Sequence, residues 1–99
     1  MALETQLGLL GLSERESRVY IALLDIGPTT TSKLIRKTGI ASSKIYDVLE
    51  RLIHKGLVTH IIKNSRKEFH PTDPKKLFDI LKEKETIINE ILPGLENMY

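Results

Sequence analysis

The hydrophobic pattern of this sequence changes from helical to extended at Gly56, and that change restricts the fold more than any other feature. Before it, apolar side chains recur at helical spacing and share one face of a predicted helix: Ile45, Val48, Leu49, Leu52 and Ile53. After it, LVTHIIK is rich in β-branched residues, NSR is typical of a turn, and KEFHP is a second short extended run. We therefore predict a helix that leads into a β-hairpin.

A capping-box pattern begins an earlier helix. Ser13 is followed three residues later by Glu16, a pairing in which each side chain bonds the backbone N–H of the other residue. Apolar residues then recur on one face until Gly27 and Pro28 stop the pattern. We predict a helix over about residues 14–26.

Two further helices are predicted to form a helix-turn-helix. Thr30 can cap a short helix that ends at Gly39, because glycine tolerates the left-handed backbone of a helix end. Ser42 or Ser43 can cap the helix that follows. Two helices joined by a tight turn and followed by a hairpin make a winged helix-turn-helix, which we assign to residues 1–72 as a DNA-binding domain.

Residues 73–99 are predicted to form one long helix. Asp73 can cap it, Pro74 suits its first position, and the helical pattern runs without a break to Pro93. Its apolar residues cover about half the circumference, more than one docking surface on so small a domain needs. We predict that it joins two copies into a homodimer, with Lys84 as the polar exception that could set the register. The interface residues would be Leu77, Ile80, Leu81, Lys84, Ile87, Ile88, Ile91 and Leu92. The alternative is a helix that folds back on its own domain.

The expected fold is therefore mainly α with a small β-hairpin, an α+β class, and its positive charge is concentrated in the middle of the chain. Residues 33–67 contain nine basic and two acidic residues, a net charge of +7, whereas the whole chain has +2. A basic middle predicts a polyanionic partner, although an unevenly charged solvated surface would give the same count. The chain has no cysteine, no secretory signal and no apolar run that could span a membrane, so we expect a cytoplasmic protein without a membrane partner.

Several short motifs between Leu9 and Val58 add to this interpretation. They are LGLS leading into ERESRVY, then Gly27-Pro28, Gly39-Ile40, SKIYDVL and KGLV. In this order they resemble the winged-helix domain of the TrmB-type transcriptional regulators, a largely archaeal family. The resemblance implies a sequence-specific regulator that binds double-stranded DNA. As a homodimer it would address half-sites about one helical turn apart, on a palindromic operator.

Two departures from the family pattern bear on what the resemblance implies. Ala41 stands where the family often has proline, which is a minor change to the turn. Many members continue into a large sugar-sensing domain, whereas this sequence stops at Tyr99. We therefore do not expect sugar binding and leave any small-molecule effector open. Short members that end in a dimerising helix are the better match.

The helix over residues 42–55 is predicted to enter the major groove, with its first turn nearest the bases. Ser42, Ser43 and Lys44 form that turn: small hydroxyls allow close approach, and the ammonium can reach guanine acceptors. The serines could equally act as caps alone. Secondary candidates further along the exposed side are Tyr46, Asp47 and Arg51. For Tyr46 the alternative is partial packing against the core.

The hairpin tip and the preceding helix supply the remaining DNA-binding candidates. The tip carries three cations around a polar turn, which suits phosphate or a narrow minor groove, although such a tip can also be merely solvated. Its residues are Lys63, Asn64, Ser65, Arg66 and Lys67. The preceding helix contributes cations that would set the register on the backbone without reading sequence. These are Lys33, Arg36 and Lys37.

The sequence contains no pattern of a catalytic or metal site. His54, His60 and His70 lack zinc-ligand spacing, and a nucleophile elbow and a glycine-rich phosphate loop are both missing. We predict no enzyme activity, no metal and no cofactor. The competing interpretation is a winged helix that serves as a protein-interaction module in transcription or other macromolecular machinery, although the basic middle segment argues against it.

Overall fold

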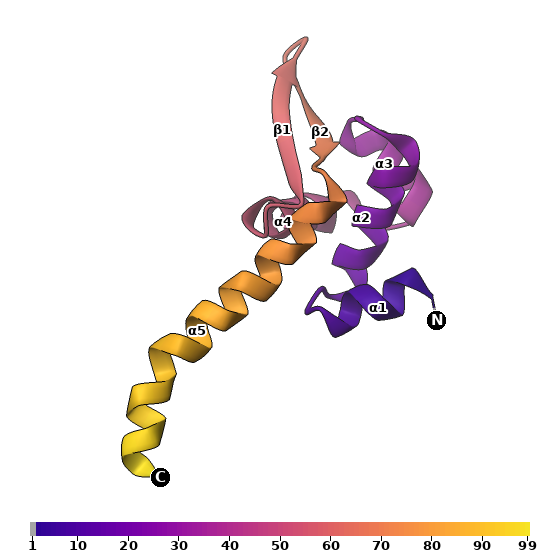
Figure 1. The fold of residues 1–99 in the computed structure, drawn as a ribbon. Coiled ribbons are helices and arrows are strands. Elements are labelled where there is room, and N and C mark those ends of the chain that lie inside the picture. The colour runs from indigo at the N-terminus through magenta and orange to yellow at the C-terminus, as the bar shows by residue number, and fades with distance from the viewer. Residues whose placement is uncertain (1) are drawn as a thin grey trace.

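The computed structural model describes residues 2–99, so residue 1 of the predicted 1–72 domain lies outside the described residues. The elements follow in the order α1 (Leu3–Leu9), α2 (Glu14–Ile26), α3 (Thr31–Thr38), α4 (Ser42–His54), β1 (Val58–Lys63), β2 (Arg66–Pro71), the 3-10 turn η1 (Pro74–Lys76) and α5 (Leu77–Met98). Helices α1 to α4 form the body, the hairpin projects from it, and α5 extends away in another direction (Figure 1). The expected fold, mainly α with a small hairpin, is confirmed.

The core lies where α2, α3 and α4 pack against one another and against the base of the hairpin. Val19 and Leu23 of α2, Leu34 of α3, and Ile45 and Leu49 of α4 have no exposed surface. The apolar face predicted for α4 is thus the buried one. Its opposite, polar face is left free for a partner.

Local signals fix the ends of these helices. Ser13 and Glu16 form the predicted capping box, with each side chain bonded to the other residue's backbone N–H. Gly39 ends α3 with φ of 73°, in the left-handed region that favours glycine. The prediction that Ser42 or Ser43 caps α4 is wrong. The extended residue before the helix is Ala41, and both serines already belong to its first turn.

The wing is a two-stranded antiparallel hairpin that is attached to the body at its base. Thr29 and Phe69 exchange two backbone hydrogen bonds of 3.0 and 2.8 Å, which tie β2 to the loop before α3. The predicted three-residue turn is one residue too long, because Arg66 pairs with Lys63 across the strands. The turn consists of two residues, Asn64 and Ser65, which have φ of 52° and 62°. Positive φ at both residues is the geometry of the tightest hairpin turns.

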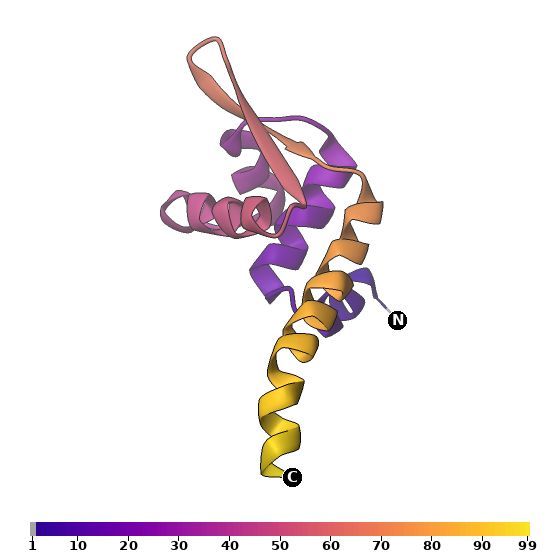
Figure 2. The ribbon, with the colours of Figure 1, turned by 60° about the vertical axis from the view of Figure 1, so that its left-hand side comes forward.

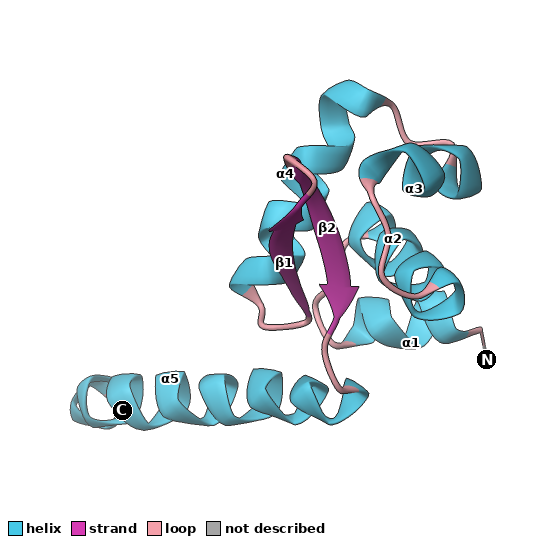
Figure 3. Cartoon of the chain, turned by 90° about the horizontal axis from the view of Figure 1, so that it is seen from above, coloured by secondary structure: helices cyan, strands magenta, loops and turns pink. Residues whose placement is uncertain are grey.

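The last helix extends past the winged helix over most of its length (Figures 1 and 2). Leu77 and Ile80 in its first turn pack against the core, but no residue of α5 is buried. The view from above shows it passing along one edge of the body and not across it (Figure 3). The sequence predicts an unbroken helical pattern up to Pro93, and the structure continues the helix through this proline. A proline on an exposed helix removes a single N–H donor, and the helix continues to Met98.

Candidate nucleic-acid interface

The exposed side of α4 begins with three consecutive polar residues. Ser42, Ser43 and Lys44 are all exposed and occupy the first turn, where a helix has backbone N–H groups without intrahelical partners. Further along, Tyr46 is 52% exposed. This exposure agrees with the predicted alternative of partial packing against the core, and it also leaves half of the side chain open to a partner. These side chains project away from the core, on a helix whose opposite face is buried.

The wing tip lies beside this helix and not on the other side of the molecule. Residues from α3, α4 and the wing line one open hollow of about 410 Å³. They are Thr30, Thr31, Ser32, Tyr46, Ser65, Arg66 and Lys67. The hydroxyls of Thr31 and Tyr46 lie 3.4 Å apart, which joins the start of α3 to α4. We call this space the wing hollow. It brings two predicted wing cations and one predicted helix residue into one surface.

The three cations predicted on α3 do not share one environment. Lys33 and Arg36 are exposed, whereas Lys37 forms a 3.0 Å ion pair with Asp25 of α2. Lys37 also lines a separate hollow with Glu4 and Thr38, away from the wing. At the tip itself, Lys63 and Asn64 are exposed beside the wing hollow without lining it.

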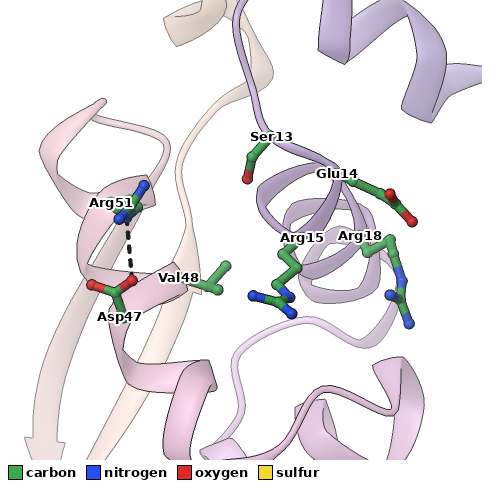
Figure 4. A pocket seen from close by; sticks show the side chains of 7 residues that line it. All are labelled: Ser13, Glu14, Arg15, Arg18, Asp47, Val48 and Arg51. Carbon is green, nitrogen blue, oxygen red and sulfur yellow. Dashed lines mark ion pairs between the residues drawn. The ribbon is translucent and has the colours of Figure 1, made fainter.

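A second open hollow, of about 490 Å³, lies between α2 and α4 (Figure 4). We call it the α2–α4 hollow. Its lining comes from the start of α2 and the middle of α4: Ser13, Glu14, Arg15, Arg18, Asp47, Val48 and Arg51. Asp47 and Arg51, both predicted DNA candidates, form an ion pair of 3.3 Å along one side of α4. The structure thus places Tyr46 in the wing hollow and Asp47 and Arg51 in the α2–α4 hollow, whereas Ser42, Ser43 and Lys44 line neither.

Arg15 and Arg18 are the cations of this region that the sequence did not identify. Of the two, Arg15 is the exposed one. It faces the Asp47–Arg51 pair across the α2–α4 hollow (Figure 4). The first third of the chain is acidic in total, so its two arginines did not stand out. The sequence offered only an arginine in the first turn of a capped helix, and the packing of α2 on α4 is what places it beside the proposed DNA-reading helix.

The apolar stripe of α5 is open to solvent in the single chain. Ile88 is 51% exposed and Ile91 49%, and Leu81, Ile87 and Leu92 are exposed as well. Along the whole helix, one line of residues recurs at alternating intervals of four and three, the spacing of the contact seam in a coiled coil. We call this line the α5 seam. Its residues are Leu77, Leu81, Lys84, Ile88, Ile91, Leu95 and Met98. Lys84 interrupts this seam and lies over Gly11, between α1 and α2.

Two observations concern other kinds of site within residues 2–99. No cluster of three or more His, Asp or Glu side chains that could hold a metal ion occurs there. None of the helices in that range combines the length and the apolar character that a membrane crossing needs.

Comparison with known proteins shows where this architecture belongs. The family model described as "Sugar-specific transcriptional regulator TrmB" matches residues 7–75. The HTH-type sugar sensing transcriptional regulator TrmBL1 of Pyrococcus furiosus is 33% identical over 81 residues, covering 82% of this chain and 23% of that protein. The uncharacterized protein YrhO of Bacillus subtilis is 37% identical over 70 residues, covering 69% of this chain and 24% of that protein. The chain therefore spans about a quarter of the length of these relatives.

Solved structures agree on the fold. TrmBL2, described as an archaeal chromatin protein, superposes with a TM-score of 0.85 at 21% identity and covers 97% of this chain and 38% of its own. Sso10a-2, a DNA-binding protein from Sulfolobus solfataricus, has a TM-score of 0.52 at 20% identity and covers 82% of this chain and 87% of its own. With the family model matching residues 7–75, the chain belongs to the TrmB family of transcriptional regulators.

Proposed function

We propose that the protein is a sequence-specific, double-stranded DNA-binding regulator that works as a homodimer in the cytoplasm, without enzyme activity. The observation that carries this proposal is the wing hollow, where Tyr46 of α4 shares one surface with Arg66 and Lys67 of the wing. A helix that enters the major groove has a phosphate backbone beside it, and a cationic hairpin next to that helix is placed to contact it. The similarity to TrmBL2 and Sso10a-2, both described as binding DNA, adds support.

The first turn of α4 is the proposed sequence reader. Ser42 and Ser43 are not caps, so their hydroxyls are free to bond bases or phosphate. Lys44 is exposed beside them and can donate to the acceptors of guanine in the major groove. Small side chains next to a long cation let the helix approach the base edges closely. Tyr46, Asp47 and Arg51 would then lie deeper along the groove walls.

The wing is the proposed backbone contact. Arg66 and Lys67 line the wing hollow, and Lys63 stands opposite Arg66 in the hairpin register. Cations at this position fix the protein on DNA without reading sequence, or enter a narrow minor groove. Lys33 and Arg36 on α3 would extend the same contact along the backbone.

The proposed dimer interface is the apolar face of α5, which comprises the predicted interface residues from Leu77 to Leu92 and, further along the seam, Leu95 and Met98. A helix of 22 residues with its seam half exposed leaves apolar surface in water, and a second copy of the same helix would cover it. The alternative, in which α5 folds back, has less support. Among residues 2–99, the apolar side chains of α5 that pack against the core are Leu77 and Ile80, and further along Lys84 reaches Gly11. Two winged helices joined in this way would address a palindromic operator.

A duplex-binding experiment tests the proposal. The sequences selected from a random duplex pool should be palindromic, and affinity for them should fall steeply as salt rises. Arg66→Ala should weaken binding, whereas Lys82→Ala, which removes the same charge from the outer side of α5, should not. A protein that binds neither selected nor random duplex at low salt would instead fit the protein-interaction module.

A further inference from the structure

We propose that the α2–α4 hollow receives the phosphate backbone of the second DNA strand, and that Arg15 is the residue that contacts it. This inference rests on the proposed function and extends it to a surface outside the helix-turn-helix and the wing. It adds a third contact, from the first turn of α2, to the two that the sequence predicted.

The first step is the position of the two hollows about α4. Tyr46 lines the wing hollow, whereas Asp47 and Arg51 line the α2–α4 hollow. Successive residues of an α-helix turn by about 100°, so Arg51 points about 140° away from Tyr46 around the helix axis. The two hollows therefore flank α4 on different sides, with the exposed face of the helix between them.

The second step is the shape of the partner. A helix in the major groove, which is about 12 Å wide, lies between two sugar-phosphate backbones. The wing hollow can take one of them. The other backbone must run along the opposite flank of α4, and the α2–α4 hollow is the open surface there. It is polar and shallow, as a surface that follows a strand has to be.

The third step is the charge on that flank. Three arginines line the α2–α4 hollow, but two are engaged by the protein: Arg51 pairs with Asp47, and the guanidinium of Arg18 donates to the carbonyl of Thr38. Arg15 is exposed and has no ion-pair partner within 4.0 Å among residues 2–99. In Figure 4 its guanidinium lies on the side of α2 that faces α4, while the carboxylate of Glu14 points away. The unpaired guanidinium of Arg15 is thus directed at the surface along which the second DNA backbone would run.

The fourth step is the class of ligand. A guanidinium binds a phosphate through paired N–H donors, and the ion pair of Asp47 with Arg51 leaves the neighbouring carboxylate neutralised. A small phosphate compound would need an enclosing site, but this hollow is open and is bounded by α4 on only one side. A continuous polyanion that is already anchored on α4 and on the wing fits it better.

The test compares the salt dependence of DNA binding in three variants with that of the wild-type protein. Arg15→Gln should reduce the slope of log affinity against log salt by about 0.9, the value for one phosphate contact, and should lower affinity about five- to tenfold at about 0.1 M salt on selected and random duplex alike. Arg15→Lys should restore most of the slope. Lys82→Gln, the matched control, removes one positive charge from α5 and should leave the slope unchanged.

Three results would overturn the assignment. The first is an unchanged slope for Arg15→Gln, with or without a loss of stability, which would mean that Arg15 serves only the folded chain. The second is an equal slope change for Lys82→Gln, which would mean a general charge effect. The third is tight, Arg15-dependent binding of inorganic phosphate alone. The proposed function stands or falls separately, on whether the wild-type protein shows salt-sensitive binding to duplex at all.

Discussion

Nζ of Lys55, which follows the last residue of α4, lies 2.5 Å from Oε2 of Glu16 in the first turn of α2. The other oxygen of the same carboxylate accepts the backbone N–H of Ser13 at 2.7 Å. Burial raises the pKa of Glu16, but the hydrogen bonds from Lys55 and Ser13 together outweigh burial and hold the pKa below its ordinary value of 4.5. One buried carboxylate thus completes the capping box of α2 and fixes the far end of the proposed DNA-reading helix.

Lys55→Met should destabilise the protein by about 2 kcal/mol, because it leaves the carboxylate of Glu16 buried without its cation. We place the loss below that of a fully buried pair, since the Lys55 side chain is one-third exposed. Urea unfolding measures it. Lys82→Met is the control, and the double variant Lys55→Met with Glu16→Gln should be more stable than Lys55→Met alone. Equal stability of Lys55→Met and wild type would show that the ion pair contributes nothing.

The stability of the wild-type protein should also fall in acid because of Glu16. A carboxyl whose pKa is lower in the folded than in the unfolded chain stabilises the fold above pH 4.5, and that contribution is lost as the pH falls through the folded value. Glu16→Gln should therefore be less stable than wild type at neutral pH, and the difference should shrink in acid. Unfolding free energies measured across this range check it; a difference that grows in acid contradicts the assignment.

The sequence predicted the elements well where a short local pattern determines the backbone. Ser13 with Glu16, Gly39 and the change of pattern at Gly56 each act within one turn of chain, and the structure follows them. No short local pattern determined in this way whether α5 continues beyond Pro93. Whether Pro93 stops a helix depends on how much of the following turn can still be hydrogen-bonded, so a proline alone did not determine it.

The candidate site was harder to predict because it depends on how helices cross. Nothing near Arg15 in the sequence indicates that it faces Asp47 and Arg51, since the packing of α2 on α4 brings them together. For the same reason the ion pair between Lys37 and Asp25 was not expected. Charge counts identified the basic middle of the chain, but could not divide its cations between surfaces.

Lys84→Leu should strengthen self-association about fivefold to tenfold, because a paired α5 seam would otherwise hold two buried ammonium groups or force them out to water. Sedimentation equilibrium gives the dissociation constant. The control is Lys82→Leu, which adds the same apolar group outside the seam and should leave the dissociation constant unchanged. Weaker association of Lys84→Leu, or no change, would argue against a seam through this position.

Ser65→Gly should stabilise the wing by about 0.5–1 kcal/mol, because Ser65 has φ of 62°, where a residue with a Cβ is strained and glycine is not. The change creates Asn-Gly, the preferred pair for this turn. The free energy of unfolding measured in urea should rise, and the affinity for random duplex should not fall. Ser65→Ala removes the same hydroxyl but keeps the strain, so it should show no gain; a gain in Ser65→Ala would assign the effect to the hydroxyl.

Lys44→Ala and Arg66→Ala should weaken DNA binding in different ways. Lys44 is in the first turn of α4, so its loss should reduce discrimination between selected and random duplex by about 1–3 kcal/mol. Arg66 lines the wing hollow and is expected to meet phosphate, so its loss should lower both affinities by a similar factor and reduce the salt slope by about one contact. Titrations of both duplexes at two salt concentrations separate the two effects. Equal losses on both duplexes for Lys44→Ala would assign Lys44 to the backbone and leave Ser42 and Ser43 as the base readers.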